Sequence, residues 1–142
     1  MGEKDQVTRL VLDTDVLVSA LLFRSEASAL FKAWRNGRFL PAVSKPILDE
    51  YARAFRYPKF RLTEQEADAI MEQLVLPYCN RFEVAAGLRF CPDPDDDKFI
   101  HCALIAQAAA FVSGDRGMLA LGSGAGRVPI ISVADACARY CC

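Results

Sequence analysis

Residues 9–22 read RLVLDTDVLVSALL. The stretch Arg9–Asp13 is a short apolar run that ends in an acid, a pattern typical of a buried parallel strand. Val16–Phe23 follows at once and is expected to be helical. A strand that leads directly into a helix is the first half of a β–α–β unit, so this stretch predicts an α/β fold on a parallel sheet.

Strand and helix patterns alternate through the rest of the chain. Further strands are predicted at Phe39–Val43, Arg81–Val84, Phe111–Ser113 and Val128–Ser132. Further helices are predicted around Ala27–Trp34 before Gly37, from the N-cap Ser44 to Phe55, from the capping box Thr63–Glu66 to about Leu74, from Asp97 into the apolar segment Phe99–Ala110, from Asp115 to Leu121, and at Val133–Tyr140. We expect one domain over residues 1–142, a three-layer α/β/α sandwich with a central, mainly parallel, Rossmann-like sheet, with residues 1–8 and 141–142 frayed.

The composition is that of a globular chain, because 53% of the residues are hydrophobic and 25% are charged, with a net charge of −1. The opening residues, MGEKDQVT, contain no apolar signal region. The longest apolar stretches are too short to span a bilayer. We therefore expect a soluble protein that stays in the cytoplasm.

The cysteines and the histidine argue against a zinc site. Six cysteines are present without a C-x-x-C pair, and His101 is the only histidine. In a cytoplasmic chain these cysteines should be reduced thiols. We expect His101 to be a packed or hydrogen-bonded side chain, since two histidines are what a metal-free attack by a 2′-hydroxyl usually needs.

Acids from distant parts of the chain are predicted to meet at one edge of the sheet. Asp13 and Asp115 each follow a predicted strand, and Asp97 opens the helix before the second of these strands. Glu50 borders the apolar stripe of the helix after Phe39–Val43. Each acid alone could be a helix cap, a turn residue or a surface residue. Their coincidence at the carboxyl ends of parallel strands, where ligands bind in such sheets, favours a site.

Carboxylates held together repel one another, so a hard cation is expected between them. Oxygen ligands of this kind suit Mg²⁺ or Mn²⁺. Ions held in this way promote displacement at phosphodiesters. The four acids therefore predict a metal site for phosphodiester chemistry.

The segment Arg24–Arg61 is basic, with nine Lys/Arg against three acids, and could attract a polyanion to the acidic cluster. The candidates for binding nucleic acid are Lys32, Arg35, Arg38, Arg53 and Arg56. Solvated helix faces are the alternative interpretation of these cations.

Four motifs together resemble the PIN-domain family, especially its bacterial and archaeal toxin-like (VapC-type) ribonuclease branch. They are VLDTDVLVSALL at 11–22, SKPILDE at 44–50, DPDDDKFI at 93–100 and VSGD at 112–115. The resemblance covers nearly the whole chain in the right order. It implies a PIN-like fold and a Mg²⁺- or Mn²⁺-dependent endoribonuclease, often a homodimeric toxin with a small cognate antitoxin.

The resemblance also implies roles for individual residues. Asp13, Glu50, Asp97 and Asp115 correspond to the metal-binding acids. Asp97 is preferred to Asp96 because Asp97-x-x-Ile100 fits the helix register of the family. Residues expected to support the ligands are Ser113, where threonine is common, Asp15, where asparagine is common, Thr14 and Asp96. We expect hydrolysis of single-stranded RNA that leaves 5′-phosphate and 3′-hydroxyl ends.

Two other interpretations compete with this one. Asp13-Thr-Asp15 after an apolar strand also resembles the nucleophile motif of haloacid-dehalogenase-like phosphatases, with Ser44 and Gly114-Asp115 as later motifs. That family usually has glycine where Val16 stands, and it leaves Glu50 unexplained. A catalytically silent PIN-type binding module is the second alternative.

Overall fold

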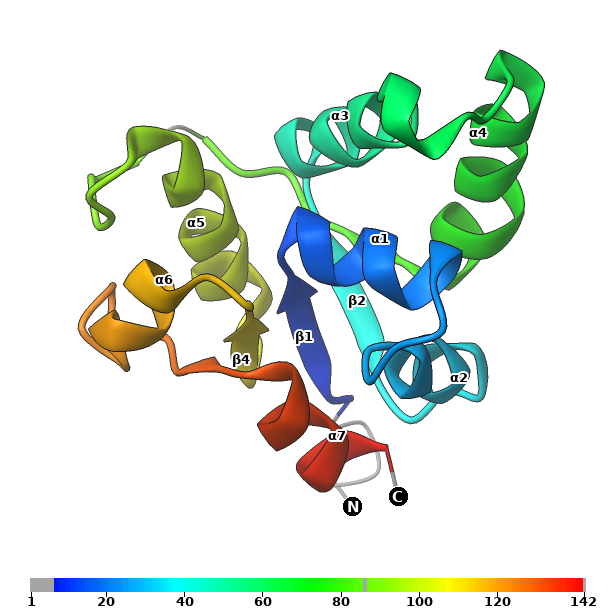
Figure 1. The fold of residues 1–142 in the computed structure, drawn as a ribbon. Coiled ribbons are helices and arrows are strands. Elements are labelled where there is room, and N and C mark those ends of the chain that lie inside the picture. Colours follow the sequence, from blue (N-terminus) through cyan, green and yellow to red (C-terminus); the bar gives the residue numbers. More distant parts are fainter. Residues whose placement is uncertain (1–6, 86, 142) are drawn as a thin grey trace.

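The central element of the molecule is a parallel sheet (Figure 1). The structure, a computed structural model, describes residues 7–85 and 87–141. In these residues five strands pair in the order β3-β2-β1-β4-β5, and every pairing is parallel. The strands are β1 (Arg9–Leu12), β2 (Leu40–Val43), β3 (Asn80–Arg81), β4 (Ala110–Val112) and β5 (Ile130–Ile131). The predicted α/β sandwich is confirmed.

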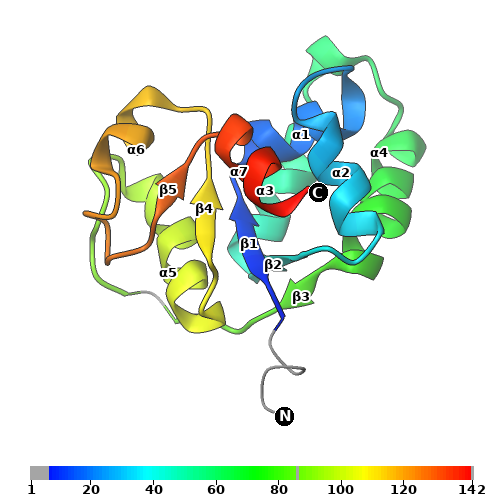
Figure 2. The same cartoon turned by 90° about the horizontal axis from the view of Figure 1, so that it is seen from below.

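Helices cover both faces of the sheet. They are α1 (Thr14–Leu22), α2 (Ser28–Arg35), α3 (Lys45–Ala54), α4 (Glu64–Ile70), α5 (Asp97–Ala106), α6 (Arg116–Leu121) and α7 (Val133–Tyr140). Helix α5 contacts β1, β2 and β4 and lies behind the sheet in Figure 2, whereas α7 lies in front of it, against α2. Short 3₁₀ turns at Pro58–Phe60 and Pro94–Asp96 join some of these elements.

The path of the chain creates a crevice between β1 and β4. From β1 the chain moves outward to β2 and then β3, and it returns through α5 to the other side of β1 to form β4 and β5. The direction of travel therefore reverses between two adjacent strands. In open parallel sheets such a switch point, at the carboxyl ends of the strands, is where ligands bind.

Buried contacts fix the end of β1. Leu10, Val11 and Leu12 have no exposed surface, which accounts for the apolar run in the sequence. The buried hydroxyl of Tyr51, on α3, donates a hydrogen bond of 2.5 Å to the carbonyl of Leu12. Because Leu12 directly precedes Asp13, this bond holds α3 against the point where the candidate site begins.

Several predicted boundaries differ from the observed ones by one to three residues. The strand predicted at Arg81–Val84 is Asn80–Arg81, although the N–H of Phe82 still bonds the Val43 carbonyl. Ser44 precedes α3 as predicted, but its buried side chain makes no cap bond. The capping box at Thr63 is confirmed, with both reciprocal hydrogen bonds present.

The ends of the described chain are bonded to its body. The carbonyl of Thr8 accepts a hydrogen bond from the N–H of Leu40, and the N–H of Cys141 donates one to the carbonyl of Cys137. Residues 1–6 and 142 lie outside the described residues. Within the part that is described, no helix is long and apolar enough to cross a membrane.

Candidate active site

Asp13 stands at the switch point, between the end of β1 and the start of α1. Its backbone N–H bonds the Val112 carbonyl of β4, and its carboxylate caps α1 by accepting from the N–H of Thr14 at 2.8 Å. The buried hydroxyl of Ser113, directly after β4, donates to Asp13 Oδ2 at 2.7 Å. The same oxygen of Ser113 accepts from the N–H of Asp115 at 3.0 Å. Ser113 therefore links the two acids that follow the two central strands.

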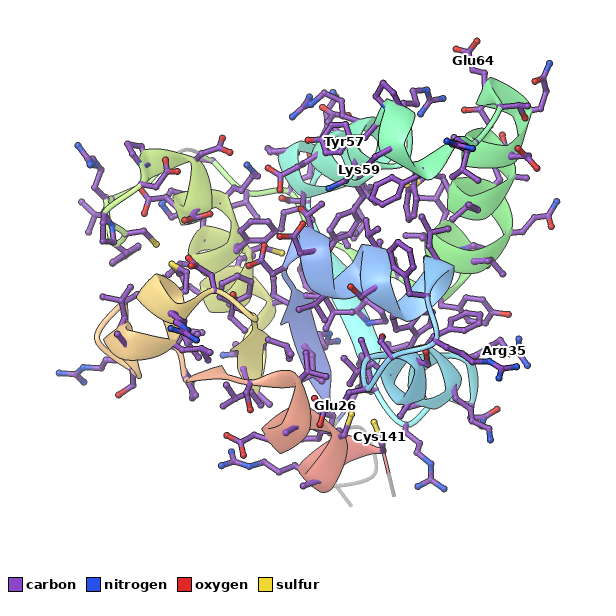
Figure 3. The ribbon with its side chains drawn as sticks, viewed as in Figure 1. Glu26, Arg35, Tyr57, Lys59, Glu64 and Cys141 are labelled. Atoms are coloured by element: carbon purple, nitrogen blue, oxygen red, sulfur yellow. The ribbon has the colours of Figure 1, made fainter. Side chains whose placement is uncertain are left out.

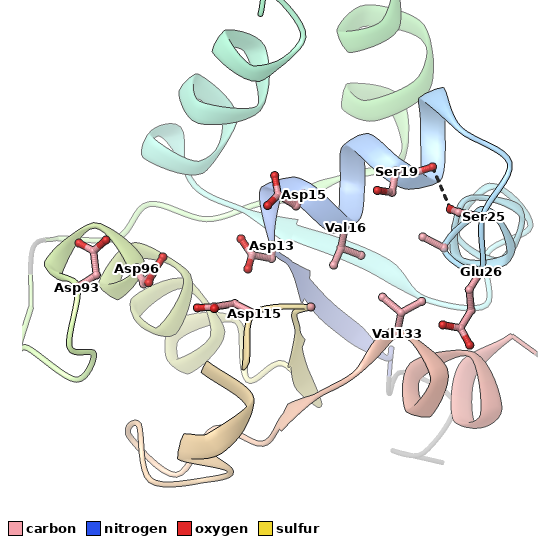
Figure 4. Close-up of a pocket in the computed structure, with 12 residues that line it drawn as sticks. Asp13, Asp15, Val16, Ser19, Ser25, Glu26, Asp93, Asp96, Asp115 and Val133 are labelled. Carbon is pink, nitrogen blue, oxygen red and sulfur yellow. Dashed lines mark hydrogen bonds between the residues drawn. The ribbon is translucent and has the colours of Figure 1, made fainter. Parts of the chain in front are cut away.

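A cavity of about 630 Å³ opens over these strand ends, and we call it the acid cavity. Half of its twelve lining residues are acidic, namely Asp13, Asp15, Glu26, Asp93, Asp96 and Asp115. Among the described residues that line it there is no lysine, arginine or histidine. Figure 4 shows the carboxylates of Asp13, Asp96 and Asp115 directed toward one common space. The acid cavity thus concentrates negative charge without a lining cation.

The surroundings in the acid cavity raise the pKa of two of these acids. Burial, followed by the negative charges of Asp13, Asp93 and Asp115, raises the pKa of Asp96 to about 6. Burial also raises the pKa of Asp13, although the hydrogen bonds from Ser113 and Thr14 act in the opposite direction. A bound cation would relieve both effects.

The side chain of Asp97, which the sequence predicted to be a metal ligand, does not line the acid cavity. Its side chain is only 5% exposed, and one oxygen accepts from the N–H groups of Phe90 and Cys91 at 2.9 and 2.8 Å. Burial would raise the pKa of Asp97, but these backbone hydrogen bonds outweigh burial and lower it. Asp97 fastens the loop before α5, and its neighbour Asp96 faces the acid cavity in its place.

Glu50 lies close to Asp13 but is engaged by other partners, and it does not line the acid cavity. The hydroxyl of Thr14 donates to Glu50, and the Lys98 ammonium lies 2.5 Å from Glu50 Oε1 and 3.1 Å from Asp95. Burial would lower the pKa of Lys98, but its bonds to Glu50 and Asp95 outweigh burial and raise it. We call these four residues the Lys98 network. Only one contact of this network could be expected from the sequence, the one between Asp95 and Lys98, because these residues are three positions apart at the start of a helix.

The acid cavity has the donors that a hard divalent cation requires. Carboxylate oxygens are the preferred ligands of Mg²⁺ and Mn²⁺. In residues 7–85 and 87–141, however, no three acidic, histidine or cysteine side chains are already close enough to hold an ion. Mg²⁺ commonly keeps several waters and binds through one or two carboxylates, so the donor set fits a hydrated ion.

The basic residues predicted to bind nucleic acid are all exposed, and none of them lines the acid cavity. Arg56 is paired with Asp68, and Arg35 lies over the ring of Phe31. Figure 3 shows Arg35 on the outer side of α2, away from the start of α1. Arg53 lies nearer, beside the Lys98 network in a groove that also contains Lys45.

His101 is a structural side chain, as predicted. Its Nε2 lies 2.6 Å from the Leu88 carbonyl, which requires the ring nitrogen to be the donor, and its ring packs edge-on against Phe90. Cys91 and Cys102 are buried free thiols, and burial raises the pKa of each to about 12. Neither thiol is therefore an activated nucleophile.

The fold and the site define an α/β protein with a cluster of carboxylates at the switch point of a parallel sheet. The family model that describes the PIN domain matches residues 9–117 of this chain. The match covers well over half of the sequence, and the chain belongs to the PIN-domain family. PIN domains are typically metal-dependent nucleases, so the family favours a nuclease. No curated protein matches the chain.

Proposed function

We propose that this chain is a metal-dependent endoribonuclease that hydrolyses single-stranded RNA and acts as the toxin of a toxin–antitoxin pair. The observation that supports the catalytic part of this proposal is the acid cavity itself. Asp13, Asp96 and Asp115 converge there, and burial together with the neighbouring negative charges raises the pKa of Asp96 to about 6. Mg²⁺ or Mn²⁺ would be held between these acids as a hydrated ion, with Asp96 taking the role first given to Asp97.

The residues around the acids hold them in position and do not transfer protons. Ser113 orients the Asp13 carboxylate by its hydrogen bond, and it fixes the start of the Asp115 loop through a second one. The Lys98 network holds Glu50 beside this group without adding its full negative charge. When bound, a divalent cation would supply charge neutralisation at the phosphodiester and activation of water.

The ends of the products test this proposal. Attack by water on phosphorus expels the 3′-oxygen, which leaves a 5′-phosphate on the downstream fragment, whereas attack by the 2′-hydroxyl leaves a cyclic phosphate. We expect 5′-phosphate and 3′-hydroxyl ends in Mn²⁺, and no cleavage with EDTA or with Asp13→Asn. Cyclic phosphate ends, or cleavage that survives EDTA and the variant, would contradict the proposal.

One of the two competing interpretations is now excluded, and the other remains. Membership of the PIN-domain family removes the haloacid-dehalogenase-like phosphatase with Asp13 as nucleophile. A catalytically silent PIN-type module remains the alternative, and the same assay separates it from the nuclease. RNA that binds but stays intact in Mn²⁺ at any protein concentration would favour the silent module.

The toxin role implies a small antitoxin and a homodimer as partners. Induced expression of the wild-type chain should stop growth, while Asp13→Asn should not. Sedimentation of the purified chain would test the homodimer. If cells that contain the active nuclease continue to grow, the toxin role is wrong, while the nuclease activity still stands.

A further inference from the structure

Three aromatic side chains cluster beside the acid cavity. Phe23 follows α1, while Tyr57 and Phe60 lie in the connection between α3 and α4. The ring centroid of Phe60 is 5.9 Å from that of Phe23 and 6.3 Å from that of Tyr57. The rings of Tyr57 and Phe60 are nearly parallel, with 17° between their planes. Side chains from two distant segments therefore form one aromatic surface.

Much of this aromatic surface is open to solvent. Phe23 is 52% exposed and Tyr57 is 49% exposed, whereas Phe39 and Phe55 are buried in the core. Grouped apolar side chains at the surface, unlike single ones, commonly mark binding sites. The cluster needs a partner that presents a flat apolar face.

The aromatic surface lies beside a groove that adjoins the acid cavity. A groove of about 460 Å³ is lined by Asp15, Val18, Ser19, Phe23, Lys59 and Phe60. Asp15 and Ser19, both on α1, also line the acid cavity, so the groove and the acid cavity are neighbours along this helix. Figure 4 shows both residues on α1, and Figure 3 shows Tyr57 and Lys59 over the α3 side of that helix. A nucleic acid strand bound in the groove would therefore have its next nucleotides beside the acids.

The groove also carries a cation. The ammonium of Lys59 lies 5.2 Å from the centroid of the Phe60 ring. In the part of the chain that the structure describes, no carboxylate forms an ion pair with Lys59. Aromatic rings beside a cation match single-stranded nucleic acid, because the rings stack on bases and the cation meets the backbone phosphate.

We infer that the aromatic surface of Phe23, Tyr57 and Phe60, together with Lys59 and the groove beside it, is a base-stacking subsite for single-stranded RNA, adjacent to the scissile phosphate. This inference rests on the proposed function, to which it adds how the substrate is held. In a duplex the base faces are stacked on one another, so the subsite selects unpaired nucleotides. Lys59 contacts a phosphate next to the stacked base.

Binding of a short fluorescein-labelled oligouridylate in EDTA tests the subsite without cleavage. Tyr57→Ala should weaken binding about 5-fold or more, because one base loses its stacking partner. Tyr57→Trp should bind like the wild type and Tyr57→Leu should not, since leucine retains apolar surface but no ring. Lys59→Gln should lower the slope of log affinity against log salt by about 0.7, while Tyr57→Ala leaves the slope unchanged.

Two matched controls isolate stacking. Leu76→Ala removes an apolar side chain that is 46% exposed, and it should leave RNA binding unchanged. An oligomer with abasic sugars keeps the phosphates, and wild type and Tyr57→Ala should bind it equally. Equal oligouridylate affinity of the wild type, Tyr57→Ala and Phe23→Ala would overturn the inference. A shift from dimer to monomer in Tyr57→Ala would also overturn it, because the rings would then cover a second copy.

The outcomes separate the subsite from the nuclease. If Mn²⁺-dependent cleavage occurs but Tyr57→Ala changes neither RNA affinity nor KM, the subsite is wrong and the nuclease stands. If affinity in EDTA depends on Tyr57 but RNA is never cleaved, the nuclease is wrong and the RNA-binding surface stands.

Discussion

The acid cavity, which Asp13 lines, and the Lys98 network, which includes the next residue, Thr14, differ in counter-charge. The acid cavity gathers Asp13, Asp96 and Asp115, and no cation lines it among the residues that the structure describes. In the Lys98 network the ammonium lies within 3.1 Å of Asp95 and closer to Glu50. The number of acids at a sheet edge therefore does not decide which of them can bind a metal ion. The balance of charge around each carboxylate decides it, because a carboxylate paired with lysine must first lose that partner.

The largest expected effect is on catalysis. Asp96→Asn should reduce the single-turnover rate of RNA cleavage in Mn²⁺ by at least about 100-fold, because a lost ligand forfeits several kcal/mol of charge stabilisation. Glu50→Gln, in the Lys98 network, should reduce it less than about 10-fold. If both variants lost the same fraction of the cleavage rate, the distinction between the acid cavity and the Lys98 network would be wrong, since Glu50 would then leave Lys98 and act as a metal ligand.

A second effect concerns stability in the presence of metal. Mn²⁺ at about 100 times its Kd should add roughly 2.7 kcal/mol to the free energy of unfolding. For a chain of this size the melting temperature should rise on the order of 5–10 °C. Asp13→Asn combined with Asp96→Asn should remove this rise, whereas Asp97→Asn should keep most of it. A melting curve that does not respond to saturating Mn²⁺ would rule out the metal site.

Asp97 should matter for folding rather than for metal. Asp97→Ala leaves the buried N–H of Cys91 and the N–H of Phe90 without their acceptor, which should cost about 2 kcal/mol of stability. The melting temperature should fall on the order of 5–10 °C. Asp49→Ala removes an exposed partner of Lys45 and should leave the melting curve nearly unchanged. Similar curves for both variants would contradict this structural role.

The smallest effect is a dependence on pH without metal. The folded-state pKa of Asp96, about 6, exceeds the ordinary value of 3.8, so the folded chain binds its proton more tightly than the unfolded chain. The stability that Asp96 contributes is present below pH 3.8 and is lost as pH rises through 6. Allowing for solvent screening, Asp96→Asn should therefore stabilise the chain on the order of 1 kcal/mol at neutral pH in EDTA.

Denaturant melts of the wild type and of Asp96→Asn at neutral and acidic pH would measure this difference. The gain should shrink toward zero as the pH approaches 4. A wild type that is as stable as the variant at neutral pH would mean that the acid cavity imposes no charge repulsion on Asp96.

The fold could be predicted because its signals are local and repeated. The apolar run at Arg9–Leu12 and the capping box at Thr63 each specify an element from a few neighbouring residues. The predicted ends of the strands were less accurate, because the pairing between neighbouring strands determines where each strand begins and ends. Asn80 joins β3 since it pairs with Ala42 and since Arg9 donates to its side chain at 2.5 Å.

The site was harder to predict than the fold. Asp95, Asp96 and Asp97 are identical in type, and one residue along a helix turns the side chain by about 100°. Only the 3₁₀ turn at Pro94–Asp96, together with the N–H groups of Phe90 and Cys91, determines that Asp97 turns inward. The pairing of Glu50 with Lys98 is likewise a tertiary contact, invisible to spacing along the chain.

The bond between Ser113 and Asp13 joins residues one hundred positions apart, and this has a consequence for biosynthesis. Until residues 110–115 have left the ribosome, β1 lacks its neighbour β4, and Asp13 lacks both Ser113 and the Val112 carbonyl. A nascent chain carries the first three acidic motifs but has no assembled acid cavity. The ribonuclease proposed above would therefore be unable to attack the messenger from which it is being translated until residues 110–115 have joined the sheet.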